Sequence, residues 1–240
     1  MRFLSANWIF PLHVPPIKEG VIQVSETGEI IDVFQTRDNV NDEILEIYNG
    51  ILCPGFVNAH CHMELSHLSG FAEKEKGLIN FIEVIQRRNT FTKDQIYESI
   101  ELAEQDMINN GIVAVGDICN TKDTILQKKN KKIKYYNFIE VFQLDEIKIN
   151  ETISQARLIR NNFRKLNLLA TIVPHAYYSV SPNLMRNIVD DFNEKDRLLC
   201  IHNQETQSEN NFLIRKMANY LIGLQPLIHH LKLAKEKNNQ

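Results

Sequence analysis

The chain has 240 residues, of which 43% are hydrophobic and 24% charged, and its formal net charge is −3 at pH 7. This size and composition are typical of a globular protein with a substantial core, either one α/β domain or a small domain beside a larger one. The slightly negative charge provides no basic field that would hold nucleic acid or an anionic membrane, so we expect a small-molecule partner.

The first 50 residues read as short strands separated by turns. Strand candidates are residues 8–10, 20–24 and 30–34, with a Glu-Thr-Gly-Glu hairpin turn at residues 26–29. We therefore predict a small, β-sandwich-like domain over residues 1–50.

After Pro54-Gly55 the pattern changes to apolar strands that alternate with amphipathic helices. The candidate strands are residues 51–59, 112–118, 134–142, 168–174 and 197–201, and the candidate helices are residues 78–88, 93–110, 121–129, 151–164 and 183–192. Repeated alternation predicts a parallel sheet, in either an open doubly wound fold or a (β/α)₈ barrel. No Gly-x-Gly-x-x-Gly follows any of these strands, which weakens the nucleotide-binding open sheet.

Four of the eight histidines fall at the carboxyl ends of these predicted strands. His60 and His62 end the first strand, His175 follows the fourth, and His202 ends the fifth. A closed barrel brings the carboxyl ends of its strands together at one mouth, where functional groups gather. We expect these imidazoles to lie close together.

The spacing of His60 and His62 indicates a metal site. Alternate side chains of a strand point to the same face, so both rings can reach one ion, while Cys61 points to the opposite face as a packed residue. With His202 as a third ligand, neutral imidazoles bind Zn²⁺ or Fe²⁺ well, and a bound water then loses a proton near neutral pH. The alternative is a set of structural histidines, each held by a carbonyl or a hydroxyl group.

Glu205 lies three residues after His202 and is our candidate for general acid-base catalysis. A carboxylate there can take a proton from an attacking water and deliver it to a substrate nitrogen or leaving group. An alternative role is stabilisation of a helix N-terminus, and the two roles can coexist.

Other candidate site residues lie near these ligands. His175 precedes a predicted helix capped by Ser181, and we expect it to contact substrate, the alternative being a packed loop histidine. Glu64 and His67 follow the histidine pair and either reach substrate or pack their loop. Asp117, near the end of the second strand, is a candidate support for the metal ligands.

Three ordered segments carry a resemblance to a known family. They are Pro-Gly-Phe-Val-Asn-Ala-His-Cys-His at residues 54–62, Pro-His-Ala-Tyr-Tyr-Ser-Val-Ser-Pro at 174–182, and His-Asn-Gln-Glu-Thr at 202–206. Together they resemble the amidohydrolase superfamily, in its cytosine/adenosine deaminase and chlorohydrolase-like branch, which includes S-adenosylhomocysteine and aminodeoxyfutalosine deaminases. The resemblance extends from about residue 1 to about residue 212.

The resemblance implies a (β/α)₈ barrel with one divalent metal ion, zinc being favoured over iron, held by His60, His62 and His202. It also implies that Glu205 shuttles protons and that His175 contacts the substrate. The family reaction is hydrolytic: water activated by the metal attacks a ring carbon that bears an amino group, and ammonia leaves. Hydrolysis of an amide or of a halogenated triazine would use the same groups.

The family pattern also includes a histidine after strand six and an aspartate after strand eight. Five strands are expected in residues 51–240, so we expect a C-terminally truncated barrel that needs a second copy or a complementing C-terminal segment. His229 and His230 lie among apolar residues at helical spacing, which favours a helix over a sixth strand. The alternative to an enzyme is a catalytically inactive fragment or a binding protein.

The expected compartment is the cytoplasm. No apolar run is long enough to span a bilayer, and no secretory signal pattern opens the sequence. The cysteines, Cys53, Cys61, Cys119 and Cys200, form no Cys-x-x-Cys pair, and we expect no disulfides.

Overall fold

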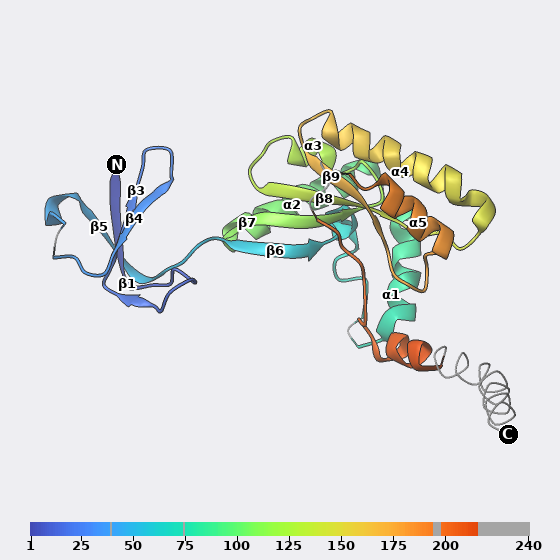
Figure 1. Cartoon of the computed structure of the whole chain (residues 1–240), viewed down its shortest axis with the longest axis horizontal. Helices are drawn as coiled ribbons and strands as arrows, with labels where there is room; N and C mark the ends of the chain where they lie inside the picture. The colour runs from blue at the N-terminus through green and yellow to red at the C-terminus, as the bar shows by residue number, and fades with distance from the viewer. Residues whose placement is uncertain (39, 74, 194–197, 216–240) are drawn as a thin grey trace, which may run out of the picture. The chain divides into compact units, whose positions relative to one another are not determined.

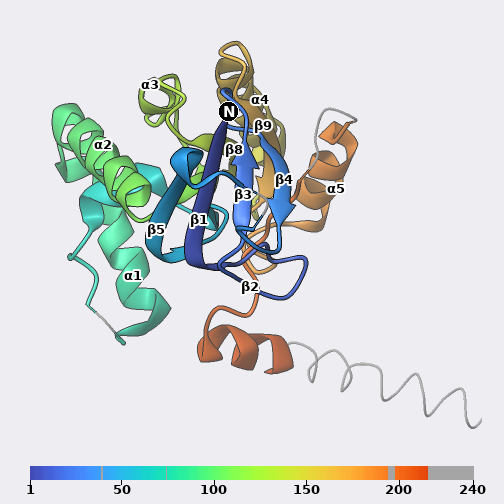
Figure 2. The ribbon, with the colours of Figure 1, turned by 90° about the vertical axis from the view of Figure 1, so that its left-hand side faces the viewer.

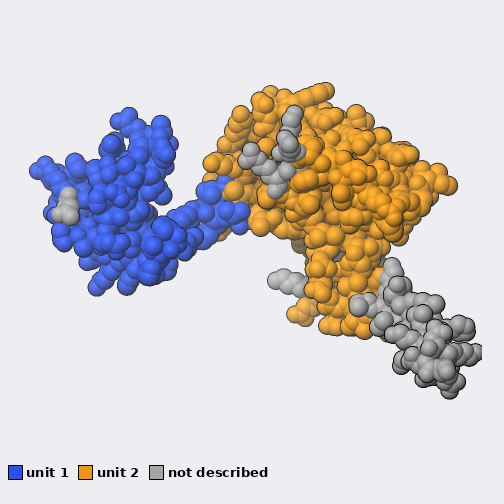
Figure 3. Space-filling view, in the orientation of Figure 1, with its two compact units in different colours: residues 1–57, 111–113 blue, residues 58–110, 114–240 orange. Residues whose placement is uncertain are grey.

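A computed structural model of the chain describes residues 1–38, 40–73, 75–193 and 198–215. The chain divides into two compact units, Met1–Val57 with Gly111–Val113, and Asn58–Asn110 with Ala114–Gln240 (Figure 3, blue and orange). Within the described residues, no helix has both the length and the apolar character needed to cross a membrane.

The first unit is built on one sheet of five strands (Figure 2). The strands are β1 (Arg2–Ile9), β2 (Ile17–Lys18), β3 (Val21–Val24), β4 (Ile30–Phe34) and β5 (Leu45–Leu52). Their order is β2-β1-β3-β4, and β5 pairs in parallel with β1. The strands therefore form a single sheet, where we expected a sandwich-like arrangement, because β1 is hydrogen-bonded to β2, β3 and β5.

The expected hairpin turn is present between β3 and β4. The N–H of Ser25 donates to the carbonyl of Glu29, and Gly28 adopts a φ of 86°, in the left-handed region that favours glycine. Ala6, Ile9 and Val21 form the buried centre of this unit.

The prediction of a single strand over residues 51–59 is wrong, because two strands share this range. The structure ends β5 at Leu52 and starts β6 (Phe56–Cys61) four residues later. Pro54 has no N–H for a strand ladder, so it interrupts the pairing. Gly55 is required at this break, because a Cβ there would lie 2.3 Å from Cγ1 of Val113.

The second unit contains the four-stranded sheet β6-β7-β8-β9 (Figure 1). Its further strands are β7 (Ile112–Cys119), β8 (Lys134–Val141) and β9 (Leu169–Pro174), close to the predicted ranges. β7, β8 and β9 pair in parallel, as the alternation of strands and helices predicted. Their side chains are largely buried, which is typical of parallel strands covered by helices.

Helices alternate with these strands along the chain. They are α1 (Gly77–Gln86), α2 (Lys93–Asn109), α3 (Ile125–Lys128), α4 (Ile149–Arg164) and α5 (Pro182–Asp191). Thr92 and Gln95 form a capping box at the start of α2, and Ser181 caps α5 with Pro182 in its first turn. α4 packs against β8 and β9, and α5 packs against β9 and α4. The helix expected over residues 121–129 is shorter than predicted.

The predicted fifth strand is not formed as a regular element in the described residues. Residues 198–201 carry no strand, and only His202 makes an isolated parallel bridge, with Ala176. The N–H of His202 donates to the carbonyl of His175 at 2.8 Å. Leu198, Leu199 and Ile201 are exposed, so burial does not stabilise an extended strand here. In its described residues the second unit is thus a mixed α/β fold with a four-stranded sheet and two isolated bridges, Gln143 with Val180 and Ala176 with His202. His229 and His230 lie outside the described residues.

Candidate metal centre and active site

Three histidine rings converge at the carboxyl end of the sheet. His60 lies in β6, His62 directly follows it, and His202 comes from the bridge beside β9. Nε2 of His62 lies 3.3 Å from Nε2 of His60 and 3.2 Å from Nε2 of His202. Backbone pairing in two parts of the fold therefore brings one nitrogen of each ring to the same point.

This donor set fits a zinc-sized cation. Zinc binds imidazole nitrogens at about 2.0–2.1 Å, so two nitrogens of a tetrahedral site lie about 3.3 Å apart. The observed separations of 3.2 and 3.3 Å have this size. Imidazole lone pairs that face one another at this distance repel unless a proton or a cation lies between them. The set can hold one divalent ion and leave a coordination position for water.

The neutral state of the His60 and His62 rings favours metal binding. Burial lowers the pKa of His62 to about 4 and also lowers the pKa of His60. Both rings are then neutral at pH 7 and retain a lone pair for a ligand.

His202 is oriented through its other nitrogen. Its Nδ1 lies 3.2 Å from Oε1 of Glu140 and 3.2 Å from the carbonyl oxygen of His175. These acceptors favour a proton on Nδ1, which leaves Nε2 to face His62. The nearby carboxylate of Glu140 also raises the pKa of His202.

Glu140 was not among the residues expected at this site. This residue lies near the carboxyl end of β8 and is buried, and its Oε2 accepts a hydrogen bond from Nδ2 of Asn120 at 3.1 Å. Burial acts to raise the pKa of Glu140, but the neighbouring His202, His175 and Asn120 outweigh it, and the net shift is downward. The signal in the sequence was a single carboxylate in an apolar strand that ends at the same edge as the histidines.

His175 and Glu205 lie beside the three histidines. Nδ1 of His175 is 2.7 Å from Oγ of Ser179, and its ring centroid is 4.8 Å from that of His202. Oε1 of Glu205 lies 4.0 Å from Nε2 of His202, and its side chain is 42% exposed. The backbone N–H groups of Gln204 and Glu205 donate to the carboxylate of Glu209, so the carboxylate of Glu205 is left to face the histidines and solvent.

A large cavity of about 820 Å³ opens beside these residues. His62, His175 and Glu205 line it on the polar side. Its apolar lining includes Phe81, Ile82, Ile85, Phe142 and Ile159. A cavity of this size and mixed lining accommodates a nucleoside-sized ligand.

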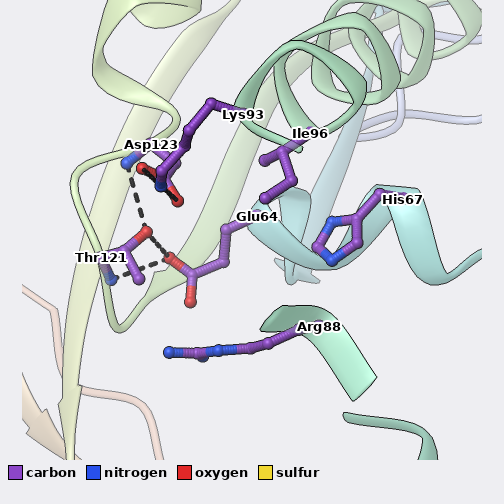
Figure 4. Close-up of a pocket in the computed structure, with 7 residues that line it drawn as sticks. All are labelled: Glu64, His67, Arg88, Lys93, Ile96, Thr121 and Asp123. Atoms are coloured by element: carbon purple, nitrogen blue, oxygen red, sulfur yellow. Dashed lines mark hydrogen bonds and ion pairs between the residues drawn. The ribbon is translucent and has the colours of Figure 1, made fainter. Parts of the chain in front are cut away.

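Glu64 and His67 lie elsewhere, in a separate polar pocket of about 100 Å³ (Figure 4). The carboxylate of Glu64 accepts hydrogen bonds from the N–H of Asn120 and from the N–H and hydroxyl of Thr121. The ring of His67 packs edge-on against Phe91. Neither side chain lines the large cavity, so their geometry favours the loop-packing alternative.

Asp117 acts on the backbone next to the ligands. Its Oδ1 accepts the N–H of Met63 at 2.8 Å, directly after His62, and its Oδ2 pairs with the buried ammonium of Lys128. Asp117 thus fixes the end of β6 rather than a histidine ring. Cys61 is packed as expected, and burial raises the pKa of its thiol to about 12.

Histidines from separate strand ends, with a carboxylate beside them and a large cavity, define a candidate metal-dependent hydrolase. The chain belongs to the amidohydrolase family, which it matches over residues 51–222.

The chain is similar to known deaminases in sequence and in fold. The chain is 24% identical over 194 residues to the 5-methylthioadenosine/S-adenosylhomocysteine deaminase of Pyrococcus horikoshii, an alignment that covers 77% of this chain and 45% of that protein. Its fold is similar to that of Helicobacter pylori aminofutalosine deaminase in complex with methylthio-coformycin, with a TM-score of 0.69, 17% identity and coverage of 84% of this chain and 50% of that one. An adenosine deaminase from Xanthomonas campestris with bound zinc gives a TM-score of 0.64, 17% identity and coverage of 86% and 50%. The chain spans about half the length of these proteins.

Proposed function

We propose that this chain carries the metal centre of an aminohydrolase that removes an amino group from an adenine-like base by hydrolysis. The observation that carries the proposal is the meeting of His60, His62 and His202 at Nε2 separations of 3.2–3.3 Å, with Glu205 next to them. The family and the deaminases similar to this chain support the same reaction class.

In this proposal His60, His62 and His202 hold the ion, for which we favour zinc over iron. When bound, the metal makes a water more acidic and orients it. Glu205 takes the proton of the attacking water and delivers it to the nitrogen of the base, because its carboxylate lies next to the histidine nitrogens and is open to the cavity. His175, held by Ser179, contacts the substrate, and the apolar wall of the cavity packs against the base.

The finer architecture is part of the proposal. We propose that residues 51–240 form part of a (β/α)₈ barrel, that residues 1–50 form a small β-domain, and that the protein works in the cytoplasm on a small molecule. The family pattern adds a histidine after strand six and an aspartate after strand eight, and the described residues contain neither strand. We propose that a complementing C-terminal segment supplies these groups.

The test is ammonia release from 5-methylthioadenosine, S-adenosylhomocysteine and adenosine by the zinc-loaded protein, with Glu205→Gln as the matched variant. We expect wild-type turnover, and a loss of roughly 10²–10⁴-fold in Glu205→Gln with zinc retained, the usual contribution of a general acid-base group. Equal turnover in the two proteins would contradict the role of Glu205.

A second function, binding without catalysis, is favoured by the absence of a sixth and an eighth barrel strand from the residues that the structure describes. A chain with this metal centre and cavity can bind zinc and a nucleoside without turning it over. Calorimetric binding of 5-methylthioadenosine by zinc-loaded protein that releases no ammonia would support this function over the first.

A further inference from the structure

Glu140 is a buried carboxylate that faces a candidate metal ligand. Its side chain is only 4% exposed, and its Oε1 lies 3.2 Å from Nδ1 of His202. Its second oxygen, Oε2, accepts a hydrogen bond from Asn120, in the loop that follows β7. Two elements, β8 and this loop, therefore set the position of the carboxylate.

The burial of Glu140 has a consequence for His202. Removing a carboxylate from water is strongly unfavourable unless each oxygen faces a donor. Asn120 satisfies Oε2, whereas Oε1 has no hydrogen-bond partner in the described part of the chain and faces Nδ1 of His202 at 3.2 Å. The carboxylate therefore stabilises the tautomer of His202 with a proton on Nδ1.

The backbone supports the same orientation. The carbonyl oxygen of His175 also lies 3.2 Å from Nδ1 of His202, and it accepts the backbone N–H of His202 at 2.8 Å. With its proton on Nδ1, the ring directs the lone pair of Nε2 toward His62, 3.2 Å away. The other tautomer, with its proton on Nε2, would place an N–H against the other histidines.

We propose that Glu140 is a positioning residue of the metal centre, which holds His202 with Nε2 ready for the ion and is itself held by Asn120. This inference rests on the proposed function, since it assumes that the three histidines bind a metal. Outer carboxylates of this kind typically contribute 10–100-fold to metal affinity.

The alternative is that Glu140 and His202 help to bind a second metal ion. Glu140, His175 and His202 offer ligand atoms within 4.8 Å of one another. An ion there needs Nδ1 of His202 without its proton, and a bare lone pair would then face the carbonyl oxygen of His175 at 3.2 Å. The geometry favours the positioning role.

The experiment measures the zinc dissociation constant and stoichiometry by competition with a chromophoric chelator at pH 7. We expect one zinc per wild-type chain, a 10-fold loss of affinity in Glu140→Gln, which keeps one acceptor oxygen, and up to 100-fold in Glu140→Leu. The cobalt-substituted Glu140→Gln protein should show shifted d–d absorption bands, which a purely structural role would not produce.

The matched control is Glu64→Gln. Glu64 is also a buried carboxylate and holds the same loop at Asn120 and Thr121, but its hydrogen bonds go to the backbone N–H groups and a hydroxyl. We expect its zinc affinity to stay within about twofold of wild type. An equal loss in Glu64→Gln and Glu140→Gln would mean a general disturbance of the loop and would overturn the inference.

The other outcomes separate this inference from the proposed function. Unchanged zinc affinity in Glu140→Gln, with loss in His62→Ala, would overturn the role of Glu140 and leave the metal centre standing. Two zinc ions per chain would overturn it in favour of the second site. Absence of zinc binding in wild type would remove the metal centre itself. If Glu140→Leu does not fold, Glu140→Gln, with almost the same volume, decides the question.

Discussion

Two polar clusters lie in the second unit, and they differ in how their hydrogen-bonding groups are satisfied. In the lysine cluster, the ammonium of Lys128 is fully buried and donates to Asp117, to Oδ1 of Asn137 at 2.6 Å and to Sγ of Cys119 at 3.4 Å. In the histidine cluster of His60, His62 and His202, ring nitrogens face one another at 3.2–3.3 Å. In the lysine cluster, protein groups accept the hydrogen bonds of the ammonium. In the histidine cluster, ring nitrogens remain available to coordinate a ligand.

The electrostatics of the two clusters follow this difference. Burial alone would lower the pKa of Lys128, but the neighbouring carboxylate of Asp117 outweighs it and raises the pKa, so the lysine stays charged. Burial lowers the pKa of His62 to about 4, so this ring stays neutral. A charged, paired cluster stabilises the fold, whereas the neutral rings of His60 and His62 keep lone pairs that are available to a cation.

The largest expected effect is on stability, in Lys128→Met. The variant leaves Asp117 buried without its cation, which typically costs about 3–5 kcal/mol of unfolding free energy. Urea denaturation measures this loss, and the zinc affinity of the folded variant should match wild type. The control is Lys93→Met, which breaks an exposed pair with Asp123 and should cost at most about 1 kcal/mol. Similar losses in the two variants would mean that the lysine cluster is not a special support of the fold.

The next effect is on zinc affinity, in His202→Ala. Loss of one of three protein ligands should weaken binding by at least about 100-fold, roughly 2.7 kcal/mol. Glu205→Gln should keep its zinc, because Glu205 lies near the nitrogens as a proton carrier and not as a ligand. Zinc content after dialysis measures both, and equal loss of zinc from the two variants would refute the assignment.

Zinc should also stabilise the folded protein. At a free concentration 100 times the dissociation constant, binding adds about 2.7 kcal/mol to the free energy of unfolding. Thermal unfolding with and without zinc should show a higher midpoint for wild type and for Lys93→Met, and no shift for His202→Ala. A shift that survives in His202→Ala would place the zinc elsewhere.

The smallest effect is on the pH dependence of stability without metal. His62 has a pKa lowered to about 4, against 6.5 when unfolded, so the unfolded chain binds the proton first. The free energy of unfolding should therefore fall as pH falls from 6.5 to 4, by about 2–3 kcal/mol from His62 alone. The raised pKa of His202 acts in the opposite direction and reduces the net loss. Urea midpoints at pH 7, 5.5 and 4 measure the slope, which should be smaller in His62→Gln. An equal slope in that variant would contradict this account.

Much of the fold and half of the site were accessible to sequence reasoning because they depend on local spacing. Alternation of strand residues determined that His60 and His62 share a face, and the apolar runs that became β7, β8 and β9 were recognisable from their neighbours in the chain. The predicted cap Ser181 likewise acts within one helical turn.

Tertiary structure decided which distant groups meet. The register of β8 between β7 and β9 places Glu140 beside His202. The loop after β7 binds the carboxylate of Glu64 by hydrogen bonds, so this carboxylate does not line the large cavity. The predicted fifth strand is present only as a bridge between His202 and Ala176, in the segment after β9. No pattern in the sequence predicts this pairing of the two backbones. Periodicity along one segment specifies the face on which a side chain lies, whereas its partner is set by strand register and burial, which involve residues far apart in the chain.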